Sequence, residues 1–525
     1  MLFVSLVVND FMTYAFTFDA SACTGCKACQ IACKDKNNLP LGVLWRRVYE
    51  VSGGSWNNVG AGFPRPETWA REPRPYDPTP VWETDVFAYN LSIACNHCVH
   101  PKCAGVCPTD AYVQRADGIV YIDESKCMGC GYCAWACPYA APQYNPARGH
   151  MTKCDFCFDN LDAGLPPSCV SACPLRVLDC VEIREQRIGN SDQKVESSEW
   201  SPANKFQPLW ETAGTEHPFP LPTYSRTQPH LAIKFHAGME NGLEKTISNR
   251  EEVNPPHSKV WPLQGASLRL WSPKSPDFGL DELPLIIFTL CAQMAAGMAV
   301  VSLFAGPLSM PTLITIGGLI GVGGLASIFH LGAPMNAWRA LNHLRKSWLS
   351  REVLMFGLFG ATWLAWTLEH WLLKTDHSSL ITALTGIGLV YSMGQVYRLR
   401  SVPAWNNWRT FTGFFVTALL LGEALTAARL SPPAVLIGAT LALLLALQFW
   451  LVRYRGVAVQ DTAMTKLRLG LIFTGVLGAD FLTLAANQTA TWMKVFIILM
   501  IITEEVLGRW QFYRARRLTN PHAHL

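Results

Sequence analysis

Residues 127–145, with the sequence CMGCGYCAWACPYAAPQYN, decide the fold of the N-terminal part of this chain. They hold four cysteines in the spacing C-x2-C-x2-C-x3-C, and a proline follows the last one. Three more such tetrads occur within the first 173 residues, so sixteen of the 18 cysteines belong to the pattern. In chain order the tetrads are Cys23, Cys26, Cys29 and Cys33; Cys95, Cys98, Cys103 and Cys107; Cys127, Cys130, Cys133 and Cys137; and Cys154, Cys157, Cys169 and Cys173.

The other tetrads repeat or vary this spacing. The first repeats it, the second reads C-x2-C-x4-C-x3-C and the fourth C-x2-C-x11-C-x3-C, and Pro108 and Pro174 follow the second and fourth. Bacterial ferredoxins use this ligand spacing: three thiolates on a tight loop hold one cubane cluster, and the fourth binds the other cluster of a pair. The pattern predicts an α+β, ferredoxin-like domain that carries electrons through four 4Fe-4S clusters.

Two other uses of the cysteines fit less well. Zinc also takes four thiolates, and the x11 gap of the fourth tetrad would by itself suit a zinc knuckle. Disulfides are typical of small secreted domains in an oxidising compartment, and neither condition fits this chain. Cys180 and Cys291 lie outside the pattern, and we expect them to act as small hydrophobic residues.

Composition divides the 525 residues into unlike parts. We expect an iron–sulfur domain over residues 1–185, an irregular tail and linker over 186–280, which is rich in Pro, Ser, Glu and Lys, and an apolar domain over 281–525. The net charge of +4 is too small to indicate nucleic-acid binding.

The last part predicts an all-α membrane domain of eight transmembrane helices. Eight apolar stretches approach the roughly 20 residues that span a bilayer. Buried helices of a soluble protein are a poor alternative, because the stretches have almost no charged face. Gly317, Gly321 and Gly324 resemble small-residue helix packing. The stretches cover residues 284–305, 311–332, 353–373, 379–398, 409–430, 433–453, 467–486 and 491–513.

Charges in the loops predict the orientation. The loops and ends on the side of the iron–sulfur domain carry fifteen Lys and Arg residues, whereas the opposite side has only Lys374, Arg429 and Lys494. The positive-inside rule then makes the iron–sulfur side cytoplasmic. The N-terminal run MLFVSLVV is too short for a span and has no basic region before it, so we expect no cleavable signal peptide; Met12 is an alternative start.

Several segments resemble a known enzyme family. CTGCKACQIACK, CNHCVHPKCAGVCP, GHMTKCDFC and CPLRVLDC make residues 13 to about 240 similar to the iron–sulfur subunit of dimethyl sulfoxide reductase-type molybdoenzymes. SIFHLGAPMNAW, the Ser-Arg-Glu that ends at Glu352, VPAW and EVLGRWQFY make residues 283–517 similar to the membrane anchor subunit of the same enzyme. The protein therefore resembles a fusion of two subunits that are usually separate.

The resemblance implies how the tetrads pair. The first pairs with the fourth and the second with the third, each giving its last cysteine to the other. Because Cys130 is present, all four clusters are expected to contain four irons. The implied ligand sets are Cys23, Cys26, Cys29 and Cys173; Cys154, Cys157, Cys169 and Cys33; Cys95, Cys98, Cys103 and Cys137; and Cys127, Cys130, Cys133 and Cys107.

His330 and Glu352 are the candidate catalytic residues at the membrane end. Haem needs axial histidines deep in helices, and the histidines near the spans lie at helix ends or in loops, so we expect no haem and a quinone site instead. A histidine can accept a quinol proton near neutral pH. The resemblance implies quinol binding for both residues, with menaquinol as the expected donor. A histidine that caps the helix and interacts with its dipole is the structural alternative.

Four further carboxylates fall in or near the spans, where such groups are expensive and are candidates for function. A proton path and helix–helix contacts are equally good explanations for them, and Glu505 can pair with Arg509 one turn on. They are Glu423, Asp480, Glu504 and Glu505.

The sequence shows no molybdopterin site, nucleotide loop or nucleophile–base set. The resemblance implies a separate molybdopterin-containing catalytic subunit, with this chain as quinol-oxidising relay and anchor in the cytoplasmic membrane of a prokaryote during anaerobic respiration. Two alternatives stay open: the same relay run in reverse from a dehydrogenase such as formate dehydrogenase, and a zinc-stabilised membrane scaffold or sensor. The ligands alone do not fix the direction of electron flow or the terminal substrate.

Overall fold

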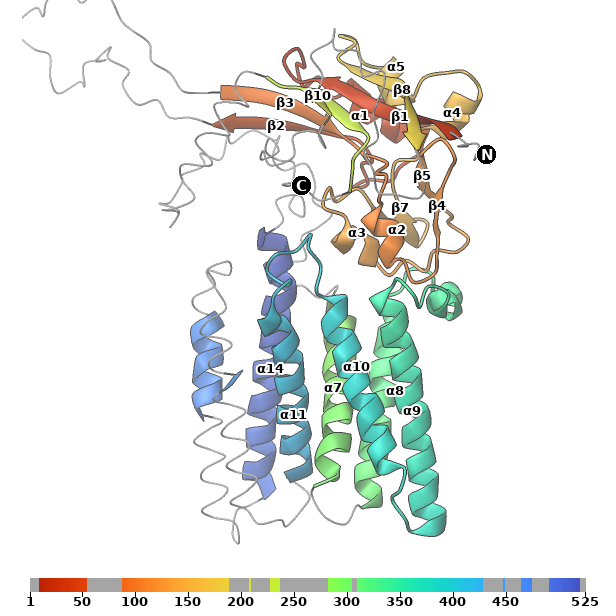
Figure 1. Cartoon of the computed structure of the whole chain (residues 1–525). Helices are drawn as coiled ribbons and strands as arrows, with labels where there is room; N and C mark the ends of the chain where they lie inside the picture. The colour runs from red at the N-terminus through yellow and green to blue at the C-terminus, as the bar shows by residue number, and fades with distance from the viewer. Residues whose placement is uncertain are drawn as a thin grey trace, which may run out of the picture.

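The computed structural model describes residues 9–53, 87–187, 207–208, 227–236, 282–304, 309–427, 447–448, 464–474 and 491–519. An N-terminal α+β part sits on one end of a bundle of long helices (Figure 1). This arrangement agrees with the predicted ferredoxin-like domain followed by a helical membrane domain.

A four-stranded sheet ties the two ends of the N-terminal part together. Its order is β8 (Leu178–Arg187), β1 (Asn9–Asp19), β10 (Leu231–Lys234), β9 (Gln207–Pro208). β1 runs antiparallel to β8 and parallel to β10, so Phe16 faces Cys180 on one side and Leu231 on the other. Phe16 and Phe18 are buried on one face of β1, and Thr13, Ala15 and Thr17 are buried on the other, so both faces of this strand are covered.

The sheet changes one predicted boundary. We expected residues 186–280 to form an irregular linker, but residues 231–234 add β10 to the sheet and β8 ends at Arg187. The four-residue run LAIK is too short to give a periodic signal, and only its pairing with the distant β1 makes it a strand. Most of the expected linker lies outside the described residues.

Hairpins and short helices complete the N-terminal part. β2 (Arg47–Gly53) pairs with β3 (Phe87–Ile93), β4 (Tyr112–Gln114) with β5 (Val120–Ile122), and β6 (Gln143–Asn145) with β7 (His150–Thr152), all antiparallel. Between them lie α1 (Ala28–Lys36), α2 (Lys102–Val106), α3 (Tyr132–Ala136), α4 (Phe158–Asp162) and α5 (Ser168–Ser171).

Long helices match the first five predicted spans and the eighth. They are α7 (Leu283–Ser302), α8 (Met310–Phe329), α9 (Trp348–Leu373), α10 (Ser379–Val396), α11 (Trp408–Ala427) and α14 (Thr491–Thr519). Among the described residues, α7, α8 and α10 are long and apolar enough to cross a membrane. Most of the predicted span over 433–453, apart from residues 447–448, and part of that over 467–486 lie outside the described residues.

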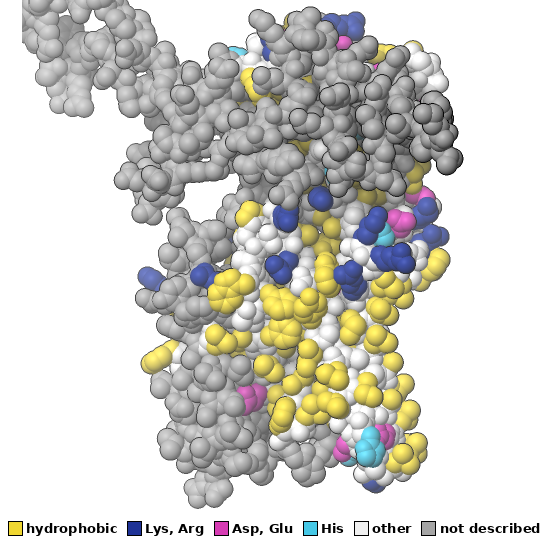
Figure 2. Space-filling view, viewed as in Figure 1, with side chains coloured by type: hydrophobic (Ala, Val, Ile, Leu, Met, Phe, Trp, Pro, Cys, Tyr) yellow, Lys and Arg dark blue, Asp and Glu magenta, His cyan; other side chains and the backbone are white. Residues whose placement is uncertain are grey.

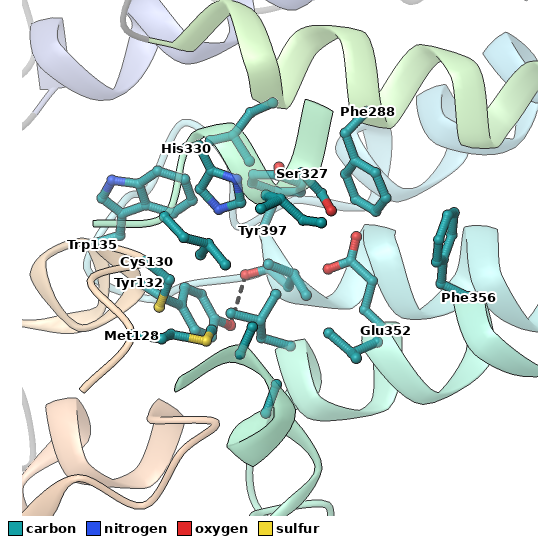
Figure 3. Close-up of a pocket in the computed structure, with 18 residues that line it drawn as sticks. Met128, Cys130, Tyr132, Trp135, Phe288, Ser327, His330, Glu352, Phe356 and Tyr397 are labelled. Atoms are coloured by element: carbon teal, nitrogen blue, oxygen red, sulfur yellow. Dashed lines mark hydrogen bonds between the residues drawn. The ribbon is translucent and has the colours of Figure 1, made fainter. Parts of the chain in front are cut away.

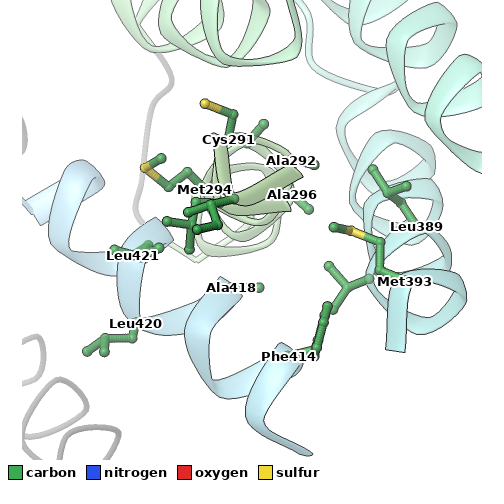
Figure 4. Close-up of a cluster of buried hydrophobic side chains, with 14 of the residues drawn as sticks. Cys291, Ala292, Met294, Ala296, Leu389, Met393, Phe414, Ala418, Leu420 and Leu421 are labelled. Atoms are coloured by element: carbon green, nitrogen blue, oxygen red, sulfur yellow. The ribbon is translucent and has the colours of Figure 1, made fainter. Parts of the chain in front are cut away.

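Helix α7 is the centre of the bundle. In the most apolar segment of α7, 78% is buried, whereas in that of α8 only 28% is buried. Helix α7 therefore contacts other helices on all sides, while α8 lies at the periphery. Figure 4 shows Ala292, Met294 and Ala296 of α7 surrounded by side chains of α10, such as Met393, and of α11, such as Phe414.

Small residues let α7 and α11 approach each other closely. A Cβ added to Gly297 would lie 1.8 Å from the backbone oxygen of Ala418, and one added to Gly422 would lie 2.2 Å from the carbonyl carbon of Gly297. The predicted glycine face of α8 is only partly used: Gly317 contacts the ring of Trp363, whereas no described atom lies within 4 Å of a Cβ at Gly321. The tightest small-residue contact is thus at Gly297 rather than on α8.

The surface of the bundle agrees with a membrane-integral domain. Figure 2 shows apolar side chains spread over the helices, and Lys and Arg side chains gathered at the end next to the N-terminal part. Leu364, Leu368, Leu380 and Ile381 are among the exposed apolar residues. Water does not favour such a continuous apolar surface, whereas lipid does.

Replacing Gly297 by Ala tests this packing. We expect Gly297→Ala to destabilise the bundle by about 1–3 kcal/mol, because the new methyl group overlaps the α11 backbone. Thermal unfolding in detergent should show a Tm lower by about 2–4 °C per kcal/mol. Gly318→Ala is the control, since no described atom lies within 4 Å of a Cβ there. Equal Tm values for the two variants would contradict this account of the α7–α11 contact.

Candidate iron–sulfur centres and quinol pocket

In all four cysteine tetrads, a helical turn joins the third cysteine to the fourth. In each, the x3 interval before the last cysteine is about one helical turn, and this turn carries the last cysteine away from the loop of the other three. The turns are α1 for Cys29 and Cys33, α2 for Cys103 and Cys107, α3 for Cys133 and Cys137, and α5 for Cys169 and Cys173.

Left-handed residues bend the C-x2-C loops around their sulfurs. The φ angle is +72° at Gly129 in the third tetrad and +65° at Phe156 in the fourth. The backbone N–H of Gly129 donates to Cys127 Sγ at 3.4 Å, and that of Phe156 to Cys154 Sγ at 3.4 Å. Amides aimed at the sulfurs are suited to thiolates that carry the negative charge of a cluster.

Two cavities bring together cysteines from tetrads that are far apart in the sequence. The first is lined by Cys23, Cys26, Cys29 and Cys173. The second is lined by Cys95, Cys98, Cys103 and Cys137. In both, three cysteines come from one tetrad and the fourth is the last cysteine of another. This exchange coincides with the pairing that the resemblance implies.

The remaining eight cysteines are grouped in the same way. Cys33 interacts electrostatically with Cys157 and Cys169, and with Cys154. Cys107 interacts in this way with Cys127, Cys130 and Cys133. Among the described residues, no three His, Cys, Asp or Glu side chains converge on the position of a single metal ion. The cysteines of a cubane surround a wider group, and the four exchanged sets suit such a group.

The third tetrad is held against the ends of the membrane helices. Asn336, His343 and Ser347, from the segment between α8 and α9, contact backbone carbonyl oxygens of the second and third tetrads at Cys127, Cys107 and Val106, at 2.9, 2.9 and 2.7 Å. This segment contains the 3₁₀ helix η3 (Pro334–Leu341). A Cβ on Gly332 would lie 1.9 Å from the backbone oxygen of Gly149, so the two parts touch through their backbones.

Aromatic residues of α3 extend the same contact. The Tyr132 hydroxyl donates to the backbone oxygen of Val396 at 2.9 Å. The Trp135 ring packs edge-on against Trp405 with ring centroids 5.5 Å apart, and it also contacts Tyr397 and Tyr513. The helix that carries Cys133 is therefore wedged between α10, the loop after it and α14.

A cavity of about 170 Å³ lies beside this wedge. Its polar side chains include His330, at the end of α8, and Glu352, near the start of α9, while Cys130 and Tyr132 come from the third tetrad. In Figure 3 the His330 imidazole and the Glu352 carboxylate both point into the space between the helices and the third tetrad. Most other lining residues are apolar, Leu285, Phe288 and Phe356 among them.

The two predicted catalytic residues are thus brought together, 22 positions apart in sequence. Glu352 is buried, with 4% of its surface exposed. The His330 imidazole faces the backbone of Ser327, but its Nδ1 has no hydrogen-bond partner within the described part of the chain. Sequence reasoning missed Tyr132, Trp135 and Tyr397. The aromatic letters inside the third tetrad were a usable signal for the first two.

The buried carboxylates of α14 have partners. Glu504 accepts two hydrogen bonds from the guanidinium of Arg468, and Glu505 accepts from Thr417 at 2.9 Å and from Gln448 at 3.0 Å. These contacts join α14 to α11 and to residues 447–448 and 464–474, which supports helix–helix contact as one role. Glu423 is buried on α11, and Asp480 lies outside the described residues.

Comparison with known families identifies both halves. Residues 86–183 match the family described as a 4Fe-4S dicluster domain, and residues 277–465 match the family described as DMSO reductase anchor subunit (DmsC).

Curated relatives match the N-terminal half. One of the component chains of anaerobic dimethyl sulfoxide reductase from Escherichia coli is 40% identical over 242 residues, which are 46% of this chain and 98% of the relative. The protein of the same name from Haemophilus influenzae is 41% identical over the same shares. A tetrathionate reductase subunit of Salmonella typhimurium is 32% identical over 42% of this chain and 79% of its own length. With the anchor match in the C-terminal half, this protein is a member of the dimethyl sulfoxide reductase family, as an iron–sulfur subunit and a membrane anchor subunit joined in one polypeptide.

Proposed function

We propose that this chain oxidises membrane quinol and relays the electrons, through four 4Fe-4S clusters, to a separate molybdopterin-containing catalytic subunit in anaerobic respiration. The observation that carries the proposal is the single cavity that joins His330 and Glu352 to Cys130 of the third tetrad. A proton-accepting pair beside a cluster ligand is what two-electron, two-proton quinol oxidation needs.

The cavity suits a lipid-soluble substrate. Its walls are largely apolar, and Ile328, which lines it, is 47% exposed on α8 at the bundle surface. The next residue, Phe329, is 80% exposed. A hydrophobic ring with a prenyl tail can reach the cavity along this lipid-facing helix without passing through water.

His330 and Glu352 would divide the proton chemistry. An imidazole nitrogen without a partner can accept the proton of one quinol hydroxyl, and the buried carboxylate can accept the other. Tyr132 and Tyr397 line the same cavity, and they can orient the ring. The wall at Cys130 brings the ring close to the third tetrad, so electrons leave on the side of the N-terminal part.

We assign four ligand sets to the clusters, and when bound these clusters accept and donate single electrons. The sets are Cys127, Cys130, Cys133 and Cys107 beside the cavity; Cys95, Cys98, Cys103 and Cys137; Cys154, Cys157, Cys169 and Cys33; and Cys23, Cys26, Cys29 and Cys173. The last set includes Cys26, which is exposed, so it is the set from which a docked catalytic subunit can take electrons.

The direction and the partner are part of the proposal. The match of residues 277–465 with a DMSO reductase anchor subunit supports flow from quinol toward a reductase rather than from a dehydrogenase toward quinone. The proposal also includes eight membrane spans, one for each apolar stretch of the sequence. It places the iron–sulfur domain on the cytoplasmic side, because the Lys and Arg residues gather at the end of the helices next to this domain.

Loss of His330 tests the quinol site. We expect His330→Ala to slow quinol-dependent reduction of the clusters about a hundredfold, the lower end of what general acid–base groups contribute, with cluster EPR signals unchanged. Stopped-flow absorbance with a menaquinol analogue measures the rate. His377→Ala, an exposed histidine in the turn between α9 and α10, is the control. A wild-type rate in His330→Ala would exclude this residue as the proton acceptor.

Loss of Cys130 tests which cluster adjoins the cavity. In Cys130→Ser we expect one of four EPR signals to change, together with slower reduction by quinol, because this sulfur lines the quinol cavity. Cys180→Ser, outside the tetrads on β8, should keep both the signals and the rate. A changed signal with wild-type quinol kinetics would place the entry point at another cluster.

Protease access tests the orientation. Because the basic residues lie on the side of the iron–sulfur domain, we expect cleavage within residues 186–280 in inverted vesicles and protection in right-side-out vesicles. Immunoblotting of the two products measures this. Cleavage only in right-side-out vesicles would place the domain outside the cytoplasm.

A further inference from the structure

Two buried cations lie among the cysteine sets of the N-terminal part. Arg46 is 1% exposed and Lys153 is 3% exposed. Among the described residues, neither forms an ion pair with Asp or Glu. A buried charge without an opposite charge is strongly destabilising, so each must be compensated by something else.

Arg46 lies between the sets that contain Cys29 and Cys33. It interacts electrostatically with Cys29 of one set and with Cys33, Cys154 and Cys169 of the other. Its Nη1 donates to Ser92 Oγ at 3.3 Å, and that hydroxyl is 3.4 Å from Cys29 Sγ. Its Nε and Nη2 have no hydrogen-bond partner within the described residues.

Lys153 lies between the sets that contain Cys95 and Cys154. Its Nζ donates to Cys95 Sγ at 3.4 Å and to the backbone oxygen of Cys154 at 3.0 Å. It also interacts electrostatically with Cys103. Asp155 lies within electrostatic reach but too far for an ion pair. The nearest negative charges are therefore those that cluster-bound thiolates would carry.

The set beside the quinol cavity has a different environment. Glu124 lies within electrostatic reach of Cys127, but its carboxylate is paired with Arg148 at 2.7 Å and with His150 at 2.8 Å. Tyr132, next to Cys133, interacts with Glu352 and Cys130. Three sets therefore share two buried cations, whereas neither cation is among the groups that interact electrostatically with Cys127, Cys130 and Cys133.

We propose that Arg46 and Lys153 raise the midpoint potentials of the three clusters farther from the cavity and leave that of the cluster beside it unchanged, which favours electron transfer away from the quinol site. A reduced cluster is one charge more negative than an oxidised one, so a nearby buried cation stabilises the reduced form and raises the midpoint potential. Each transfer moves one electron between neighbouring clusters and neither makes nor breaks a bond. This inference rests on the proposed four-cluster relay.

The test is a redox titration of the whole protein followed by EPR. Arg46→Gln and Lys153→Gln keep a hydrogen-bond donor and remove the charge. We expect each Gln variant to lower the equilibrium constant for reduction of two clusters at least tenfold, which lowers their midpoint potentials by about 59 mV for one electron. One cluster, held by Cys33, Cys154, Cys157 and Cys169, should respond to both variants, and the cluster beside the cavity to neither. Arg46→Lys, which keeps the charge, should stay close to wild type.

Lys36→Met is the matched control, because Lys36 also lies near Cys157 but is exposed and paired with Asp159. Water and salt screen such a charge, so no potential should move. Full iron content with unchanged potentials in both Gln variants, or an equal shift of all four clusters, would overturn the inference. The titration uses dithionite and no quinol, so unchanged potentials in a protein that still oxidises quinol would leave the proposed function standing. Absence of four-iron signals from the wild type would remove both.

Discussion

The structure depends on the contact between the third cysteine tetrad and the ends of α8, α9 and α10. The two parts that meet there have opposite solvent requirements, since one folds in water and the other in lipid. Carbonyl oxygens of Val106, Cys107 and Cys127 face this contact and would lose water on docking. An unsatisfied buried carbonyl costs about 1–3 kcal/mol, and Ser347, His343 and Asn336 satisfy these three. Polar partners therefore fix the distance between the tetrad and the cavity.

The helical turn inside each tetrad gives the N-terminal part its connectivity. Four residues of helix rise about 6 Å, so the last cysteine of a tetrad leaves the group formed by the first three. It meets three cysteines of a second tetrad instead, as Cys137 does beside Cys95, Cys98 and Cys103. Each cavity is then completed only when two distant segments are folded together. Cluster binding and tertiary folding are coupled for this reason.

Much of this architecture could be predicted from the sequence, because its signals are local. Cysteine spacing predicted the tetrads, and apolar length predicted the helices that the structure describes. His330 and Glu352 were proposed from their position at helix ends together with the resemblance to the anchor subunit, although nothing local indicated that they share a cavity. The strand β10 was missed because LAIK becomes a strand only through β1, more than 200 residues earlier. The α7–α11 contact was missed because Gly297 and Gly422 are informative only as a pair.

The buried polar groups are of two kinds, those that have hydrogen-bond partners and those that lack them. Arg468 and Glu504 satisfy each other inside the bundle, and removing either would leave a buried charge, which typically costs 3–5 kcal/mol. Because these two side chains pair with each other, a helix–helix contact accounts for their burial without any ligand. By contrast, Nδ1 of His330 and two nitrogens of Arg46 are among the buried nitrogens that have no hydrogen-bond partner within the described residues, as are Nε of Arg509 and Nε2 of Gln511. For His330 and Arg46 the fold bears that cost at positions that adjoin the proposed quinol and cluster sites. A proton acceptor must keep a free lone pair, and a charge that acts on a cluster must lack a nearer counter-ion. The missing partners that destabilise the protein are therefore what these sites need in order to work.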